Sequence, residues 1–297
     1  MGREQSHRYR VVDVFTERSL EGNALAVFPD ASDIEPETMQ RIARELNLAE
    51  TTFVLPPTRS DCVARVRIFT PMKEMCFAGH PTLGTAFVLL DEGLVPKDRS
   101  SFFLEENIGS VPVRVEAGER PMLWLNTPPI ETGRCYDPLL CAEILGLNPS
   151  DLLDIAPQFL SAGNPTVFVA LRDKGAVDRA WLGLTGIRAL RGSDPESLCV
   201  FVFTPTMAGA YSRMFAPEYG IAEDPATGSS TGPLAAFMMR HGLVSNASGT
   251  RFVSEQGTKM GRRSILHVHI RGEQGTEGIE VGGHVTPVAI ASMHLAL

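Results

Sequence analysis

Glu50, His80 and Asp224 are three titratable side chains that could carry a proton. His80 and Asp224 open two copies of one pattern, [His/Asp]-Pro-x-x-Gly-[Thr/Ser], at 80–85 and 224–229. Imidazole and carboxyl groups are the commonest general acids and bases, and an apolar cleft brings the pKa of a carboxyl group toward the working pH. A donor and an acceptor on opposite walls of a cleft could therefore move a hydrogen within one small molecule.

The residues beside these patterns could hold an anion. We predict that helices begin at His80 and Asp224, where unpaired N–H groups and the positive end of the helix dipole attract a negative charge. Gly79 and Gly228 would let the backbone approach a ligand, as would Gly84, and Thr82 and Ser229 would add hydroxyl donors. The chain has neither a P-loop lysine nor a G-x-G-x-x-G fingerprint. We therefore expect a small carboxylate-bearing substrate instead of a nucleotide.

Simpler interpretations of the same residues remain open. Asp224 could be an ordinary helix N-cap, because its carboxylate can accept from the first backbone donors of the helix. His80 could be a packed cap residue. Glu50 lies where a predicted helix gives way to a predicted strand, and its position alone is typical of a solvated linker charge.

Further matches around the two patterns indicate an internal duplication. Arg-x-Phe-x-Pro occurs at 67–71 and 213–217, and Gly-Asn occurs at 22–23 and 163–164. Downstream, the segment at 103–106 resembles that at 252–255. The matches keep the same order along the chain, as expected of a repeated structural unit.

Each half is predicted to contain several strands and one long helix. The first long helix follows His80 and stops at Gly93, and the second follows Asp224 and stops at Gly242. We predict a first domain over residues 1–118 and a second over 119–285. A final strand, 286–295, has no counterpart in the first half, and we expect residues 286–297 to complete the first domain.

Composition excludes several classes of protein. The 297 residues are 43% hydrophobic and 21% charged, which is typical of a folded globular protein. A net charge of −8 disfavours nucleic-acid and membrane-surface partners, which would require a basic face. No apolar run is long enough to span a membrane, and the polar first residues do not resemble a signal peptide. We therefore expect a cytoplasmic protein.

The cysteines predict neither a disulfide framework nor a metal site. There are five, and no two have C-x-x-C spacing. We expect no metal, although Cys76, two residues before the Ala78-Gly79-His80-Pro81 segment, leaves a thiol role to be checked.

Five segments together resemble the phenazine-biosynthesis PhzF-like family, which has the diaminopimelate epimerase fold. The similarity runs nearly from end to end. The segments are Asp13-Val14-Phe15-Thr16 with Gly22-Asn23, Asn47-Leu48-Ala49-Glu50-Thr51-Thr52-Phe53-Val54, Arg67-Ile68-Phe69-Thr70-Pro71, Phe77-Ala78-Gly79-His80-Pro81-Thr82-Leu83-Gly84-Thr85-Ala86, and Glu223-Asp224-Pro225-Ala226-Thr227-Gly228-Ser229.

The resemblance implies an α+β fold of two pseudo-symmetric domains. Each would be a barrel-like, mostly antiparallel sheet around a central helix, with the active site between the domains. It also implies a cofactor-independent isomerase, usually a homodimer. Glu50 would move the proton, His80 and Asp224 would occupy the other functional positions, and Ser229 would bind the substrate.

The sequence departs from the related epimerases and racemases, which use a pair of cysteines. Ala78-Gly79-His80-Pro81 and Asp224-Pro225-Ala226-Thr227-Gly228 stand where those enzymes have thiols. The segment Lys73-Glu74-Met75-Cys76 is also bulkier and more charged than the family pattern. Our main hypothesis is an isomerase that uses acid/base catalysis. A non-catalytic metabolite-binding or interaction protein on the same fold, and a lyase that begins with the same proton abstraction, are the alternatives.

Overall fold

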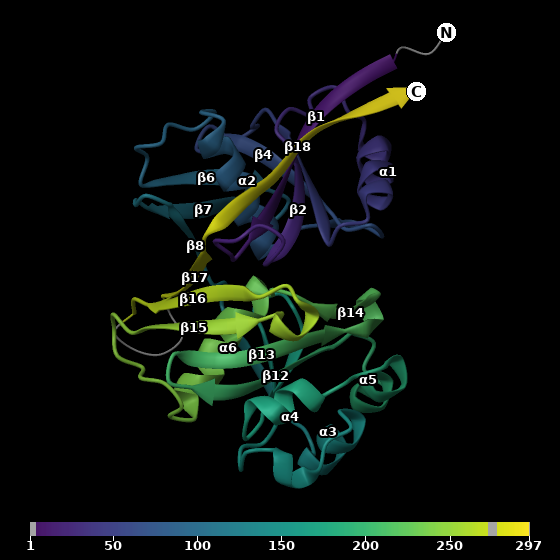
Figure 1. Ribbon diagram of the computed structural model, residues 1–297, viewed down its shortest axis with the longest axis vertical. Coiled ribbons are helices and arrows are strands. Elements are labelled where there is room, and N and C mark those ends of the chain that lie inside the picture. Colours follow the sequence, from purple (N-terminus) through teal and green to yellow (C-terminus); the bar gives the residue numbers. More distant parts are fainter. Residues whose placement is uncertain (1–3, 273–277, 297) are drawn as a thin grey trace. The chain divides into compact units, whose positions relative to one another are not determined.

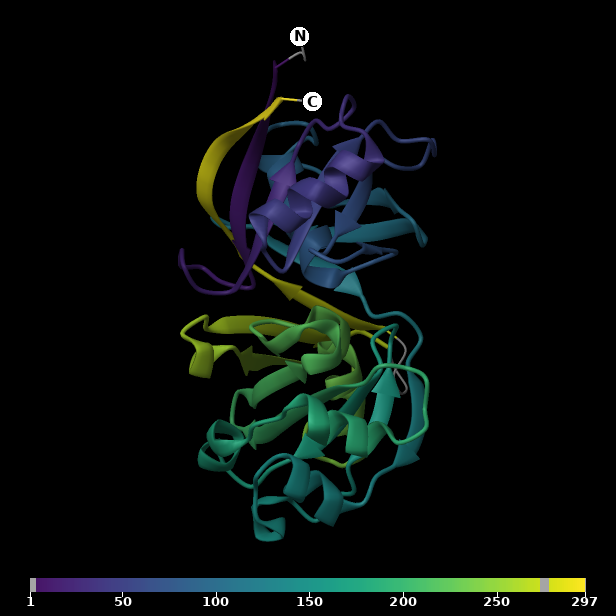
Figure 2. The same cartoon turned by 90° about the vertical axis from the view of Figure 1, so that its right-hand side faces the viewer.

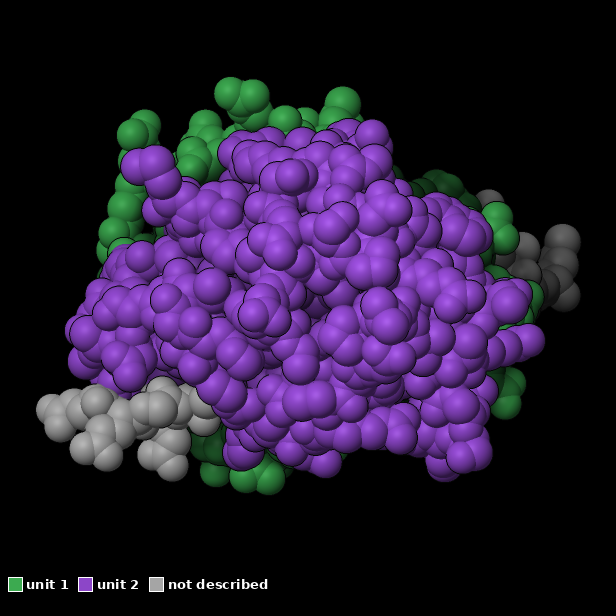
Figure 3. Space-filling model, turned by 90° about the horizontal axis from the view of Figure 1, so that it is seen from below, with its two compact units in different colours: residues 1–125, 282–297 green, residues 126–281 purple. Residues whose placement is uncertain are grey.

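The computed structural model describes residues 4–272 and 278–296, and the chain divides into two compact units (Figures 1 and 3). Unit 1 contains residues 1–125 and 282–297, and unit 2 contains residues 126–281. These limits lie a few residues from the predicted domain boundaries. The interpretation of the units as two related domains stays a prediction.

Unit 1 contains both termini of the chain, and its described residues form two helices and a set of mostly antiparallel strands. The helices are α1 (Pro36–Leu46) and α2 (Gly79–Asp91). The strands are β1 (Glu4–Val14), β2 (Asn23–Phe28), β3 (Glu50–Leu55), β4 (Ala64–Phe69), β5 (Glu74–Met75), β6 (Ser101–Glu106), β7 (Gly109–Glu116), β8 (Met122–Asn126, which ends one residue into unit 2) and β18 (Val285–Ala296).

Unit 2 has more helical segments than the sequence predicted, since α4 and α5 were not anticipated. Its α-helices are α3 (Pro138–Ile144), α4 (Lys174–Arg179), α5 (Leu184–Arg191) and α6 (Gly228–Arg240), with 3-10 turns at Pro149–Asp151, Pro217–Tyr219 and Thr258–Met260. Its strands are β9 (Glu131–Cys135), β10 (Gln158–Ser161), β11 (Thr166–Ala170), β12 (Cys199–Thr206), β13 (Gly209–Ala216), β14 (Ile221–Asp224), β15 (Arg251–Gln256), β16 (Ser264–Ile270) and most of β17 (Ile279–Gly283).

Strands pair in the same order within each unit. In unit 1, β1 pairs antiparallel with β2, β2 parallel with β3, and β3 antiparallel with β4. β4 then pairs antiparallel with β5 and parallel with β6. Unit 2 repeats this order with β10, β11, β12, β13, β14 and β15. A parallel pair needs a crossover connection, and helices occupy the same crossovers in both units.

The last strand returns to the start of the chain. β18 pairs antiparallel with β1 from Val285 opposite Val14 to Ala296 opposite Glu4 (Figures 1 and 2). Residues far apart in sequence therefore lie side by side in one sheet of unit 1.

α2 is the core helix of unit 1. It is apolar around most of its circumference, as expected of a helix buried on all sides, and it packs against β1, β2 and β3. Gly84 lies inside this helix, where a Cβ would come within 2.5 Å of the Leu25 side chain and 2.9 Å of that of Val14. The absent side chain at Gly84 thus lets the helix approach the sheet, and not a ligand as the sequence suggested.

Both predicted helix starts were wrong. α2 begins at Gly79 with Ala78 as its N-cap, so His80 is the second helical residue. α6 begins at Gly228 with Thr227 as its N-cap, and Asp224 is the last residue of β14. Within the described ranges, neither helix start is capped by a side chain. None of the helices in those ranges has the length and apolar character needed to cross a membrane.

Candidate active site

Glu50 is carried at the first position of β3, directly after the end of α1. Asn47 ends the helix in the left-handed conformation, and three residues later the chain enters β3 beside Leu25 of β2. The four residues that follow in the strand are buried, whereas the Glu50 side chain retains 14% exposure. A carboxyl group on a rigid strand end, partly open to solvent, is suited to meet a ligand.

His80 lies against Glu50. Its Nε2 is 3.1 Å from Oε2 of Glu50, and its Nδ1 is 3.4 Å from Nδ2 of Asn23. The Asn23 amide nitrogen can only donate, so Nδ1 must accept and the ring proton must reside on Nε2. In this tautomer the ring proton lies on the nitrogen that contacts Glu50, and the 3.1 Å contact is a close approach without hydrogen-bond geometry.

His80 is neutral at physiological pH. The ring is buried, with 6% exposure, and burial lowers its pKa to about 3 because the charged form loses its hydration. A neutral imidazole can donate one hydrogen bond to Glu50 without becoming an ion. The arrangement places a carboxyl group next to a neutral imidazole.

The first turn of α2 also presents backbone donors. Gly79 and His80 are its first two residues, and Pro81 has no N–H. Since the N-cap Ala78 offers no side-chain acceptor, the helix start can receive an anion from outside the helix. Gly79 is half-buried, so its backbone remains reachable.

Thr82 is less available than its sequence position suggested. Its side chain is fully buried, and its Oγ lies 2.7 Å from the Ala78 carbonyl and 2.6 Å from Oε1 of Glu106. Its N–H donates to the same Ala78 carbonyl. Both polar groups of Thr82 are engaged within unit 1, and we therefore assign it to the support of the helix start.

Sequence reasoning missed Glu106. This carboxyl group ends β6, is 4% exposed, and has its pKa raised to about 8 by burial. Adjacent glutamates on a strand point to opposite faces, but the apolar and charged residues at 101–106 do not reveal which one points inward. Once the structure shows that Phe102 and Leu104 are buried, strand alternation places Glu106 on the same face as these two residues.

In unit 2, Asp224 lies beside the start of α6. Its Oδ2 accepts a hydrogen bond from the Thr227 hydroxyl. The Asp224 backbone carbonyl accepts from Nε2 of Gln256, and the Thr227 N–H donates to Oε1 of the same glutamine. Asp224 is half-buried and is therefore partly accessible from outside unit 2.

Ser229 and Gly228 form the first turn of α6. Both are half-buried. The Asn164 amide donates to Ser229 Oγ over 3.5 Å and to Ser230 Oγ over 3.2 Å. Because hydroxyl groups can accept and donate at once, Ser229 keeps a proton with which to bind a ligand.

The two helix starts are related by a different register from the one the motif suggested. α2 and α6 are both thirteen residues long, so Gly79 corresponds to Gly228 and His80 to Ser229. Thr82 and Thr231 confirm the register, since each hydroxyl contacts the carbonyl of its own N-cap residue.

The strands leading to the helices keep this register. Arg67 forms an ion pair with Glu74 in unit 1, and Arg213 forms one with Glu223 in unit 2. The next residue along each strand is also paired, Ile68 with Met75 and Met214 with Asp224. Asp224 therefore corresponds to Met75. The predicted match of His80 with Asp224 was wrong, because the Pro-x-x-Gly pattern recurs there out of register.

Cys76 and the possible metal ligands can be located in the structure. Cys76 is exposed and occupies the position that Pro225 has in unit 2, so the thiol has no symmetric partner there. Among the described residues, no three His, Cys, Asp or Glu side chains gather as metal ligands would.

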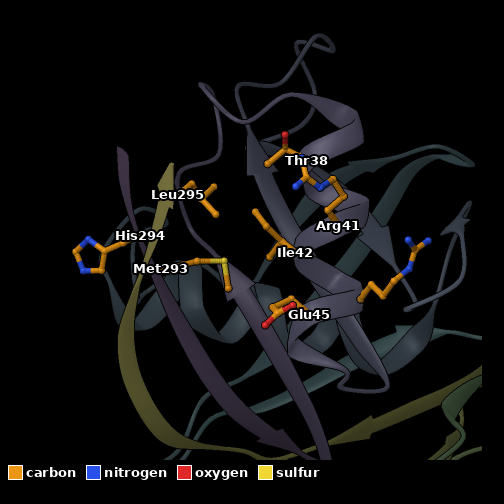
Figure 4. A pocket seen from close by; sticks show the side chains of 8 residues that line it. Thr38, Arg41, Ile42, Glu45, Met293, His294 and Leu295 are labelled. Atoms are coloured by element: carbon orange, nitrogen blue, oxygen red, sulfur yellow. The ribbon is translucent and has the colours of Figure 1, made fainter. Parts of the chain in front are cut away.

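A surface hollow lies elsewhere in unit 1. It measures about 530 Å³ and is lined by residues of α1, including Ile42, and of β18, including Met293 (Figure 4). None of the predicted site residues lines it. The predicted site residues lie instead near the starts of α2 and α6 and at the start of β3.

Comparison with known proteins reveals close relatives. The family model described as phenazine biosynthesis-like protein matches residues 12–291. The trans-2,3-dihydro-3-hydroxyanthranilate isomerase of Pseudomonas aeruginosa is 38% identical over 289 residues, covering 94% of this chain and 96% of that protein.

Solved structures share the fold. A phenazine biosynthesis protein of the PhzF family from Bacillus anthracis superposes with a TM-score of 0.86 at 24% identity, covering 97% of this chain and 99% of that one. A hydroxyproline epimerase from Agrobacterium vitis has a TM-score of 0.66 at 13% identity, and the superposition covers 100% of this chain and 95% of that one. The second structure extends the likeness of fold to epimerases.

Proposed function

The chain belongs to the phenazine biosynthesis-like family and is an isomerase, and we propose that it moves a proton within a small carboxylate-bearing metabolite without a cofactor. The observation that carries this proposal is the 3.1 Å contact between His80 and Glu50. It places a partly exposed carboxyl group directly beside a neutral, buried imidazole.

In the proposed mechanism Glu50 is the acid/base. Its carboxylate takes a proton from a carbon of the substrate, and the resulting carboxylic acid returns a proton to a different carbon. A positioned general base contributes about 10²- to 10⁴-fold to the rate of such a step. We propose that His80, whose Nε2 lies 3.1 Å from Oε2 of Glu50, directs its N–H to that oxygen during the reaction and so orients the carboxyl group.

We propose that unit 2 supplies the other wall of the site. Gly79 of α2 and Gly228 of α6 would direct backbone donors at the substrate carboxylate, and the Ser229 hydroxyl would donate to it. Asp224 would assist the proton transfer from its own side. The repeated helix starts and the family resemblance support this proposed interdomain site, to which each unit would contribute one helix N-terminus that can bind an anion.

The substrate class follows from these donors. A carboxylate is one of the anions that uncapped helix starts and a serine hydroxyl can hold. The Pseudomonas aeruginosa relative acts on a cyclic amino carboxylate by its name, so trans-2,3-dihydro-3-hydroxyanthranilate is the first compound to test here.

The test is hydrogen exchange in heavy water. The protein is incubated with a panel of cyclic and amino-acid carboxylates, and deuterium incorporation and product mass are followed by NMR and mass spectrometry. The proposal predicts a carbon-bound deuterium in an isomer of unchanged composition. A product lacking the elements of water would indicate the lyase instead, and binding without exchange across the panel would contradict catalysis.

We also propose that the protein is a homodimer, as the family resemblance implies. Sedimentation equilibrium at micromolar concentration gives the mass directly. A mass near 32.3 kDa, that of one chain, would overturn this part of the proposal.

A further inference from the structure

Glu106 is a buried carboxyl group placed under the first turn of α2. Its Oε1 lies 2.6 Å from Thr82 Oγ, and among the described residues its buried Oε2 has no hydrogen-bond partner. Unpaired buried polar atoms are rare, and an ionised carboxylate in that position would be costly. Such a group calls for an explanation that the proposed reaction does not yet supply.

The hydrogen bonds around Thr82 determine where the proton of this cluster lies. The Thr82 hydroxyl has a single proton but two short contacts, one to the Ala78 carbonyl at 2.7 Å and one to Glu106 at 2.6 Å. A carbonyl can only accept, and so can an ionised carboxylate. Both contacts can be hydrogen bonds only if Glu106 is protonated, so that Glu106 donates to Thr82 while Thr82 donates to Ala78.

The surroundings favour the neutral acid for an independent reason. Burial raises the pKa of Glu106, and the Thr82 hydroxyl opposes that shift only in part. The charged groups on nearby strands have partners of their own: Glu105 binds Thr58 and Glu74 binds Arg67. On α2 itself, His80 is neutral. Within the described ranges, no charged side chain shifts the Glu106 pKa.

Unit 2 has a neutral group at the corresponding place. β6 pairs parallel with β4 in unit 1, and β15 pairs parallel with β13 in unit 2. When these two strand pairs are compared, Glu106 and Gln256 occupy equivalent positions. In the structure, residues 103–106 therefore correspond to residues 253–256, and not to 252–255 as the sequence match suggested. This difference of one residue matters because neighbouring side chains on a strand point to opposite faces. Gln256 is fully buried and donates its amide to Thr227 Oγ over 3.0 Å, at the N-cap of α6.

We propose that Glu106 is a positioning residue, which as a neutral carboxylic acid holds Thr82 and thereby fixes the turn of α2 that presents His80 to Glu50. His80 lies between Ala78 and Thr82, the two residues that this chain of hydrogen bonds ties together. Ionisation of Glu106 removes the donor and loosens that turn. This role rests on the proposed function, since it acts through the Glu50–His80 pair.

Two variants of Glu106 separate the proposal from a merely structural role. Glu106→Gln keeps the shape and an N–H donor, as Gln256 does in unit 2, whereas Glu106→Leu removes the donor. We expect Glu106→Gln to retain kcat at neutral pH within about 3-fold, and Glu106→Leu to lose on the order of 10-fold in kcat with little change in KM. Thr82→Val should lose as much as Glu106→Leu, and the double variant no more than either.

The pH profile is the decisive readout. In the wild type, kcat should decline as pH rises above about 8, the pKa of Glu106, and this decline should be absent in Glu106→Gln. The proposal is overturned if Glu106→Gln loses as much activity at neutral pH as Glu106→Leu, or if both proteins share the same alkaline decline.

A measurement that needs no activity keeps this test separate from the proposed function. Infrared difference spectra of wild type minus Glu106→Gln should show the carbonyl band of a protonated carboxylic acid at pH 7, disappearing in an alkaline titration. A carboxylate band at pH 7 would overturn the proposal even in an active enzyme. An inactive protein that still shows the acid band would indicate failure of the proposed function alone.

Discussion

His80 and Ser229 occupy the same position in the two units, as the second residue of α2 and of α6. Each side chain is contacted by the amide nitrogen of an asparagine, His80 by Asn23 and Ser229 by Asn164. Asn23 is the first residue of β2, and Asn164 lies two residues before β11. The two units thus share the supporting amide and differ in the group that it contacts. One helix start carries an imidazole, for which we propose a part in acid/base catalysis, and the other carries a hydroxyl, for which we propose a part in binding.

The tautomer of His80 can be tested by changing Asn23. Asn23→Asp keeps the shape but turns a donor into an acceptor, so the ring proton should move to Nδ1. Nε2 would then face Glu50 as an acceptor, and kcat should fall on the order of 10²-fold. Nitrogen-15 NMR of the ring reports the tautomer directly. The matched control is Asn164→Asp, which should cost less because serine hydroxyls can turn to donate.

The burial of His80 predicts an acid-sensitive stability. Its pKa is about 3 in the folded protein, below the ordinary value of 6.5, so the unfolded chain binds the extra proton. The free energy of unfolding should therefore fall as pH decreases from about 6.5 toward 3, by at most about 1.4 kcal/mol per pH unit. Urea denaturation of wild type and His80→Gln across this range measures the difference. Parallel curves for the two proteins would contradict a neutral, buried ring.

Glu106 predicts the opposite dependence. Its folded pKa of about 8 lies above the ordinary 4.5, so the folded protein holds the extra proton. The stability that this proton gives is complete below about pH 4.5 and is lost as pH rises toward 8, again by at most about 1.4 kcal/mol per pH unit. Relative to Glu106→Gln, the wild type should become steadily less stable over that interval. A difference that does not vary with pH would mean that the carboxyl group is ionised in the folded state.

Independence from cofactors can be tested by removal. Glu50 and His80 suffice for the proposed proton transfer, so extensive dialysis against a chelator and a desalting step should leave kcat within about 2-fold of its starting value. Activity that disappears on dialysis and returns with a metal salt or a small-molecule fraction would contradict the proposal.

The sequence predicted the elements that carry the site better than the details of the site. Strands at 52–55 and 286–295 and the long helices after residues 80 and 224 could be predicted because alternation, helical spacing and glycine stops are local signals. The helix starts were misplaced because His-Pro and Asp-Pro resemble N-cap pairs, whereas in the structure Ala78 and Thr227 occupy those caps. Cap geometry depends on the strand that delivers the chain, which a local pattern does not contain.

The spacing of residues along the sequence could not identify two residues of the site. Glu50 was selected by the family resemblance alone, since its contact with His80 joins residues thirty positions apart through the packing of α2 on β3. Glu106 was missed because its role depends on burial beneath α2. Both cases require the tertiary structure, which brings carboxyl groups from strand ends to the same helix turn.

The central claim is that Glu50 transfers the proton, and Glu50→Gln tests it most directly. The measurement is the rate of deuterium incorporation into a reactive carboxylate in heavy water, with the exposed Glu37→Gln as the matched control. We predict that Glu50→Gln slows exchange by about 10²- to 10⁴-fold while its unfolding midpoint stays close to that of the wild type, and that Glu37→Gln exchanges at the wild-type rate. Exchange at the wild-type rate in a folded Glu50→Gln protein would contradict the account.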